Sequence, residues 1–131
     1  YRYDKGNRRG DEDSDVIEII EDERQKKGII PKKYSQDEII RRYMTAMINE
    51  AANVVHEKIA LKPSDVDVVK LFGYGFPRYR GGPLKYADQY GLDKLLNDLK
   101  IFQKEDPIFW SPSELIKNLV EKGDNFESLN K

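Results

Sequence analysis

Apolar residues recur at three- and four-residue steps along most of this chain, a spacing typical of amphipathic helices. The longest such run covers residues 35–58, and its start carries the capping-box pattern Ser35-x-x-Glu38. We expect this segment to be the central helix of the core. Its predicted apolar stripe consists of Ile40, Met44, Met47, Ile48, Ala51 and Val55.

Five or six further helices are predicted around it from the same periodicity and from Gly and Pro punctuation. The first covers residues 14–27, begins at Asp13 or Ser14, and stops at Gly28. The last helix is expected to begin at Ser111-Pro112-Ser113-Glu114, with Ser111 as the cap, Pro112 at the first helical position and Glu114 at the third. Gly123 is expected to end this helix. The others are expected from Ser64 to residue 72, over residues 83–90 and over residues 92–102. No convincing alternating strand is visible, so the expected fold is all-α.

Composition places the chain among helical domains with a heavily solvated surface. Of 131 residues, 36% are charged and 38% are hydrophobic, and 23 Lys and Arg nearly balance 24 Asp and Glu. Because of this balance, the chain has no net positive charge that would attract nucleic acid or an anionic membrane. Cysteine is absent, which excludes disulfides and thiolate metal sites. No apolar run reaches the ~20 residues that span a bilayer.

The sequence divides into a polar N-terminal arm, residues 1–13, and a single helical domain, residues 14–131. The arm has nothing to bury and alternates basic and acidic runs. Because the chain begins at Tyr1 without a methionine, we expect it to be a piece of a longer polypeptide.

A stretch rich in glycine and proline, residues 73–83, separates two predicted helices. It reads Gly-Tyr-Gly-Phe-Pro-Arg-Tyr-Arg-Gly-Gly-Pro. Glycine reaches backbone angles that other residues avoid, and proline fixes φ, so the loop is expected to hold one shape. We expect Phe76 and the tyrosines to pack inward while Arg78 and Arg80 face water or an anion. The predicted structural positions are Gly73, Gly75, Pro77, Gly81, Gly82 and Pro83.

These motifs form an ordered series that resembles a known family. Asn49-Glu50-Ala51-Ala52, Ser64-Asp65-Val66-Asp67, the Gly-rich stretch, Tyr86-Ala87-Asp88 and Gly91-Leu92 follow one another at the right separations. The series resembles the C-terminal domain of 3-hydroxyacyl-CoA dehydrogenases, above all in multifunctional fatty-acid β-oxidation enzymes that also carry an enoyl-CoA hydratase. The resemblance is strongest over residues 35–99. It implies an all-α domain like those of 3-hydroxyacyl-CoA and 6-phosphogluconate dehydrogenases.

The resemblance also implies that this chain lacks the catalytic parts. The family's catalytic histidine and glutamate, and its NAD site, belong to a nucleotide-binding domain that these residues do not contain. An asparagine of the first helical repeat, nine residues before a Glu-Ala pair, completes the family's site. The same count from Glu50 gives Arg41. We therefore expect the second, non-catalytic repeat, with no catalytic residue and no cofactor of its own, and no activity from this chain alone.

Individual residues and short motifs could also indicate dinucleotide, RNA, metal or phosphate binding. Gly73 and Gly75 give G-x-G, but Pro77 and Arg78 break the dinucleotide-binding motif and a predicted helix precedes it. Arg80-Gly81-Gly82 occurs once, whereas RNA-binding segments repeat that triplet. His56 is the only histidine, so no metal site is expected. Arg78 and Arg80 could meet a phosphate, such as one on coenzyme A, or could pair with carboxylates and pack on tyrosines.

The expected role is therefore packing and association within a parent enzyme, with the missing N-terminal parts as partners; the alternative is an independent acyl-CoA-binding module. Alone, the chain is expected to form a homodimer with Trp110 shielded, through apolar residues of segments 92–102, 109–110 and 115–120. No nucleic-acid partner is expected. The predicted location is the bacterial cytoplasm, because Ser128-Leu129-Asn130-Lys131 is not a peroxisomal signal.

Overall fold

The computed structural model describes residues 1–6 and 8–131, which form two compact units, residues 1–35 and residues 36–131. The predicted boundary after Asp13 falls inside the first unit and stays a prediction. Within the described part of the chain, no helix combines the length and apolar character that crossing a membrane requires.

The first unit contains the helix α1 (Ser14–Lys26). The Asp13 carboxylate caps it by accepting from the Asp15 amide at 3.1 Å. It ends as predicted at Gly28, where the Ile29 amide donates to the Arg24 carbonyl at 2.8 Å in a Schellman arrangement. Before α1, two backbone hydrogen bonds join Arg2 to Asp11. No α1 residue is buried within this unit.

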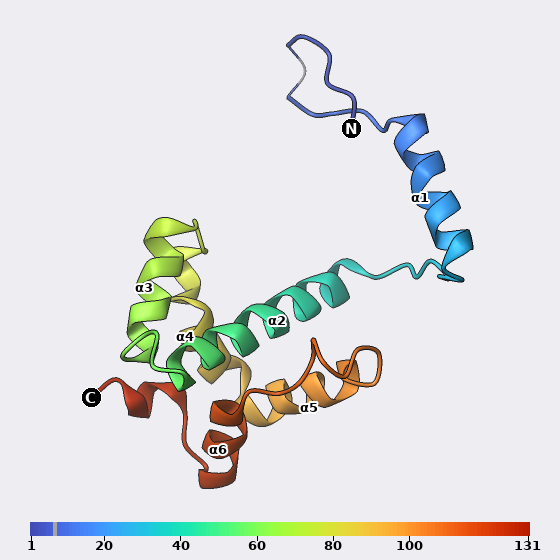
Figure 1. Cartoon of the computed structure of the whole chain (residues 1–131). Coiled ribbons are helices and arrows are strands. Elements are labelled where there is room, and N and C mark those ends of the chain that lie inside the picture. Colours follow the sequence, from blue (N-terminus) through green and yellow to red (C-terminus); the bar gives the residue numbers. More distant parts are fainter. Residues whose placement is uncertain (7) are drawn as a thin grey trace. The chain divides into compact units, whose positions relative to one another are not determined.

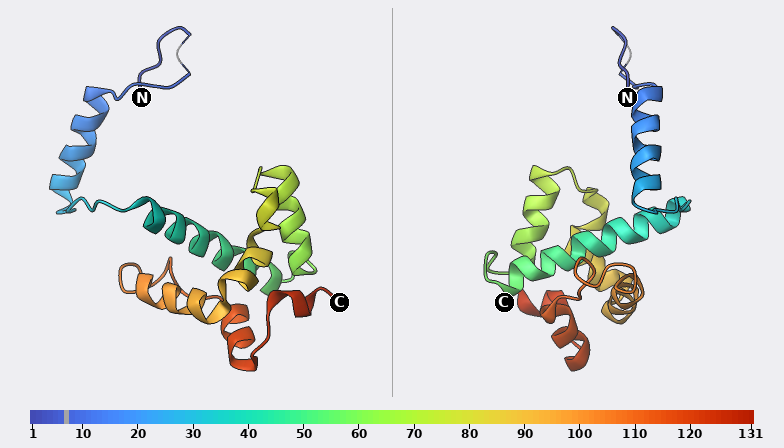
Figure 2. Two further views of the ribbon diagram at one scale, coloured as in Figure 1. Left: turned by 180° about the vertical axis from the view of Figure 1, so that it is seen from behind. Right: turned by 45° about the vertical axis from the view of Figure 1, so that its right-hand side comes forward.

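The second unit is built from five α-helices and two short 3-10 helices, coloured from teal to red in Figures 1 and 2. They are α2 (Gln36–His56), α3 (Pro63–Gly73), η1 (Arg78–Arg80), α4 (Pro83–Tyr90), α5 (Leu92–Phe102), α6 (Glu114–Lys122) and η2 (Phe126–Leu129). The predicted all-α fold is confirmed for residues 1–6 and 8–131, where the only β pairing is the isolated Arg2–Asp11 bridge.

The long helix α2 is central, as predicted, because α3, α4, α5 and α6 all contact it. Its inward face carries Met44, Ile48, Ala51 and Ala52, and the small side chains of Ala51 and Ala52 let neighbouring helices approach. Only part of the predicted stripe is buried: Ile40, near the N-terminus of α2, is 43% exposed, and Met47 and Val55 are only partly buried. The rest of the core is formed by Val66, Phe76, Leu84, Ala87, Leu92, Leu95, Leu99, Phe102, Trp110, Ile116, Leu119 and Phe126.

This core overturns the expectation that apolar residues of segments 92–102 and 115–120 stay uncovered. Leu95, Leu99 and Ile116 are fully buried by the unit's own helices. Trp110 is shielded, but by the chain itself, with its ring 4.9 Å from that of Phe102. One small core therefore absorbs both helices.

The start of α6 also differs from the prediction. Ser113, not Ser111, is its N-cap residue, so Pro112 precedes the helix and Glu114 opens it. The Ser113 hydroxyl makes no capping bond. The reason lies outside the local sequence, because Asn49 of α2 fixes this segment by the hydrogen bonds described below.

Candidate functional site

The Gly-rich loop is organised by one carboxylate, Asp67 of α3. Its two oxygens accept from the amides of Leu84 at 2.8 Å and Lys85 at 3.0 Å, in the first turn of α4. Those amides have no partner within their own helix. Burial raises the pKa of the Asp67 carboxyl, and the two amide hydrogen bonds oppose that effect. Asp67 therefore caps α4 rather than the start of its own helix.

Gly82 precedes α4 at the point where the loop passes Asp67. Its φ is +108°, and a β-carbon there would overlap the Asp67 side chain. Only glycine fits this position without a shift. Pro83 then occupies the first position of α4, where a missing N–H is harmless. Of the other predicted loop residues, Gly73 ends α3, Pro77 precedes η1, and Gly75 and Gly81 have positive φ.

The aromatic residues of the loop divide differently from the prediction. Phe76 is buried at 7% exposure, as expected, but Tyr74 and Tyr79 are 75% and 83% exposed, so the inward packing of the tyrosines was wrong. The Arg78 guanidinium lies 5.4 Å from the Phe72 ring, and that of Arg80 lies 4.8 Å from the Tyr86 ring. Both arginines thus pack on aromatic rings, and their predicted anion contact stays a prediction.

Arg41, at the position where the resemblance places a catalytic asparagine, belongs to a buried polar network. Its guanidinium donates to Asp98 of α5, and the Tyr90 hydroxyl donates to the other Asp98 oxygen at 2.6 Å. Burial opposes the charge on Asp98, but the bonds from Arg41 and Tyr90 outweigh it and lower the pKa of that carboxyl. Burial and the Asp98 bond raise the pKa of Tyr90 to about 12.

The sequence analysis missed Asp98 and Tyr90. Asp98 stands between Leu95 and Leu99 on the inward face of α5, where an acid is expected only if it is paired. That placement was the available signal for a buried partner of a cation.

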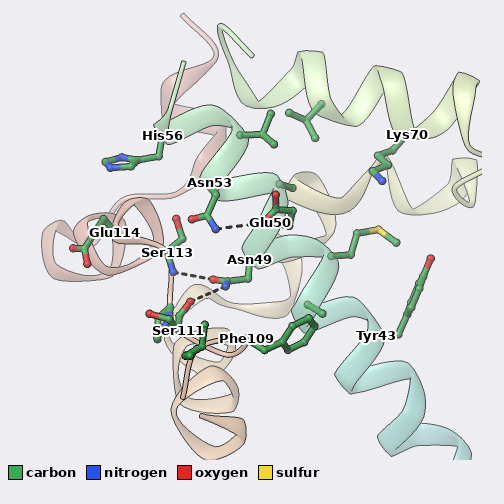
Figure 3. Close-up of a pocket in the computed structure, with 17 residues that line it drawn as sticks. Tyr43, Asn49, Glu50, Asn53, His56, Lys70, Phe109, Ser111, Ser113 and Glu114 are labelled. Atoms are coloured by element: carbon green, nitrogen blue, oxygen red, sulfur yellow. Dashed lines mark hydrogen bonds between the residues drawn. The ribbon is translucent and has the colours of Figure 1, made fainter. Parts of the chain in front are cut away.

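Asn49, the first residue of the Asn-Glu-Ala-Ala motif, holds the segment before α6. Its amide nitrogen donates to the Ser111 carbonyl, and its amide oxygen accepts from the Ser113 amide, both at 2.8 Å (Figure 3). The Ser113 hydroxyl oxygen is buried without a hydrogen-bond partner among the described residues.

A groove of about 850 Å³ runs along the exposed face of α2, beside the two hydrogen bonds made by Asn49 (Figure 3). Tyr43, Lys70 and Phe109 lie toward one end, and Asn53, His56 and Glu114 toward the other. Met47 also lines the groove. Tyr43 and Phe109 are 62% and 61% exposed. Across residues 1–6 and 8–131, no three acidic or histidine side chains gather in a way that could hold a metal ion.

The fold and the motif positions define a helical domain of dehydrogenase type, and comparison with known proteins identifies its family. Residues 39–128 match the family described as 3-hydroxyacyl-CoA dehydrogenase, C-terminal domain. The chain therefore belongs to this family.

The chain is similar to part of several longer proteins. The chain is 41% identical over 126 residues to the peroxisomal bifunctional enzyme of Danio rerio, covering 94% of the chain and 18% of that protein. It is 40% identical over 92 residues to the fatty acid oxidation complex subunit alpha of Idiomarina loihiensis, covering 70% of the chain and 13% of that protein. A glyoxysomal fatty acid beta-oxidation multifunctional protein of Brassica napus is 33% identical over 127 residues, covering 94% of the chain and 17% of that protein. The chain thus spans less than a fifth of the length of these relatives.

The first prediction concerns Gly82. Replacing it by alanine should lower the free energy of unfolding by about 1–3 kcal/mol, because the new β-carbon meets Asp67 and φ is positive. Arg80→Ala, which removes ring contacts and one exposed hydrogen bond to the Tyr79 hydroxyl, should cost far less. Thermal melts of the two variants test this. If Arg80→Ala proved the more damaging, charge rather than backbone geometry would organise the loop.

The second prediction concerns Tyr90. Its folded pKa lies above that of a free tyrosine, so its contribution to stability is present below pH ~10 and is lost as the pH rises toward 12. An ultraviolet titration should show one of the eight tyrosines ionising near pH 12. Tyr90→Phe should abolish that step and cost about 1–3 kcal/mol by depriving Asp98 of a donor. The matched control Tyr74→Phe, at an exposed site, should keep the step; its loss there would assign the high pKa to the wrong residue.

Proposed function

We propose that this chain is the second, non-catalytic helical repeat of a multifunctional fatty-acid β-oxidation enzyme, with a packing and association role. The parent would oxidise 3-hydroxyacyl-CoA to 3-ketoacyl-CoA with NAD and would carry enoyl-CoA hydratase activity. The names of the relatives support such a parent. Because these relatives are much longer than the chain, we expect its partners to be the other parts of the same polypeptide.

The observation that carries the proposal is the pairing of Arg41. A catalytic asparagine at this position would have to present its amide to a substrate. Arg41 instead donates to Asp98, which also accepts from Tyr90. Asp98 is buried, with only 2% of its surface exposed. Removing Arg41 would leave a buried acid short of its counter-charge. The position therefore serves the interior of the domain.

The geometry of the loop supports the absence of a nicotinamide site from this chain. A dinucleotide pyrophosphate needs free amides at a helix N-terminus that follows a strand. Here Gly73 ends a helix, and the first amides of α4 are already bound to the Asp67 carboxylate. These residues do not fit NAD, so the cofactor is assigned to other parts of the parent.

The alternative, an independent acyl-CoA-binding module, rests on the groove along α2. Its volume suits a ligand, and Met47 and Phe109 offer apolar surface. Two acids, Glu50 and Glu114, line the same groove and disfavour a phosphorylated ligand there. The packing role is therefore preferred. The cytoplasmic location stays a prediction, because the relatives carry organellar as well as bacterial names.

The third prediction tests catalytic incompetence. The chain alone, mixed with NAD and a 3-hydroxyacyl-CoA, should give no absorbance change from NADH formation, because neither a cofactor site nor the catalytic asparagine is present. Calorimetry with a long-chain acyl-CoA and with free coenzyme A separates the alternative, for which the acyl chain must add binding heat. Turnover that co-purified with the domain would overturn the proposal.

The fourth prediction is that the isolated chain forms a homodimer through the groove face. Exposed Ile108 and Phe109 make an apolar surface that a two-fold contact would cover. Sedimentation should show a species of twice the 15.3 kDa chain mass at micromolar concentration. Ile108→Glu should shift it to monomer. Leu61→Glu is the matched control, since Leu61 is equally exposed, at 90%, and does not line the groove. A 15.3 kDa species alone, at every concentration, would exclude this dimer.

A further inference from the structure

A second pocket, of about 400 Å³, lies between α2 and the Gly-rich loop. Two kinds of side chain dominate its lining: the aromatic rings of Tyr43, Tyr74, Phe76 and Tyr79, and the cations Lys70 and Arg80. No Asp or Glu lines it. In a chain with 24 acids and a net charge of −1, a pocket with two cations and no acid is a local concentration of positive potential.

Neither cation is neutralised by a neighbouring side chain. The Lys70 ammonium lies 4.8 Å from the Tyr74 ring centre, and Arg80 lies over Tyr86 and donates from Nε to the Tyr79 hydroxyl at 3.3 Å. Within residues 1–6 and 8–131, no carboxylate lies within ion-pair distance of either. Both side chains are half-buried, so their charges are less screened by water than those of fully exposed lysines.

The loop that bears Arg80 is fixed relative to Lys70. The Phe76 amide donates to the Lys70 carbonyl, and the Arg80 amide donates to the Pro77 carbonyl, both at 3.0 Å. The buried Phe76 ring anchors the turn between them. The two cations are therefore presented by a preformed frame, which reduces the ordering cost of binding.

We propose that this pocket binds a nucleotide, with the phosphate between Lys70 and Arg80 and the planar base against the exposed tyrosines. Aromatic faces stack on any base, and paired cations suit a phosphate better than a neutral ligand. The pocket volume lies within the range of small-molecule sites. A bare anion would leave Tyr43 and Tyr74 unused, which is why the ligand class is a base joined to phosphate.

This assignment refines the predicted anion contact. Arg80 lines the pocket, whereas Arg78 packs on Phe72 and does not. Lys70, on α3, takes the place that Arg78 had in the prediction. The site does not depend on the packing role proposed above, because a bound nucleotide would not supply the missing catalytic groups.

The test is calorimetry of the full chain with adenosine 5′-monophosphate, adenosine and inorganic phosphate. The nucleotide should bind saturably, and adenosine and phosphate should each bind at least about tenfold more weakly, since each lacks half of the contacts. Lys70→Gln and Arg80→Gln should each weaken nucleotide binding about tenfold. Nuclear magnetic resonance should place the perturbations at Tyr43, Tyr74 and Tyr79.

Matched controls come from the same chain. Arg78→Gln removes the neighbouring arginine of η1, and Lys94→Gln removes an ammonium 4.2 Å from the Tyr90 ring, outside the pocket. Both should bind the nucleotide like the unmodified chain, and thermal melts verify that all four variants fold. Absence of saturation at millimolar nucleotide would overturn the proposal. So would equal binding of phosphate alone, or an equal loss in Arg78→Gln and Arg80→Gln.

Discussion

Helix N-termini carry amides that have no backbone partner within the same helix, and at α3, α4 and η2 side chains from elsewhere in the fold accept from some of them. Asp67 of α3 accepts from the first turn of α4, and Asp88 of α4 accepts from Phe126 and Glu127 of η2. Asn130, near the chain's end, accepts from the Ser64 amide of α3. Each cap therefore ties one element to another, and the short helices of this unit depend on partners far away in sequence. The apolar core supplies the bulk of the stability, while these bonds set how the elements meet.

Local sequence was sufficient for most helices because periodicity, proline and glycine act within one element. Gly28 and Gly123 end α1 and α6 by positive φ, as their positions predicted. Where a distant residue decides, local signals failed. Ser111 looked like a cap, yet Asn49 holds the backbone so that α6 begins later. The helix α2 ends at His56, close to the predicted end at residue 58, and Lys58, not a glycine, takes the left-handed conformation there.

The candidate site was predictable only in outline. The Gly-rich loop was recognised as a fixed structure, and the need for glycine at position 82 follows from Asp67, which no local pattern reveals. Periodicity marks a helix as amphipathic but does not tell how much of its apolar stripe the rest of the fold covers. Ile40, which is exposed, was therefore not separated in advance from Met44 and Ile48. The pairing of Lys70 with Arg80 at one pocket, and of Arg41 with Asp98, required the tertiary structure.

Asp67 and Gly82 constrain each other in a way that reaches beyond this one sequence. A side chain at position 82 fits only if residue 67 becomes smaller, and a smaller residue 67 no longer caps α4. Neither position can change first without loss, so the two form an epistatic pair. Recombination between related domains should preserve them as a unit although fourteen residues of helix and loop separate them. An exchange point placed between α3 and α4 would combine mismatched halves of one cap, whereas an exchange point beyond α4 would leave it intact.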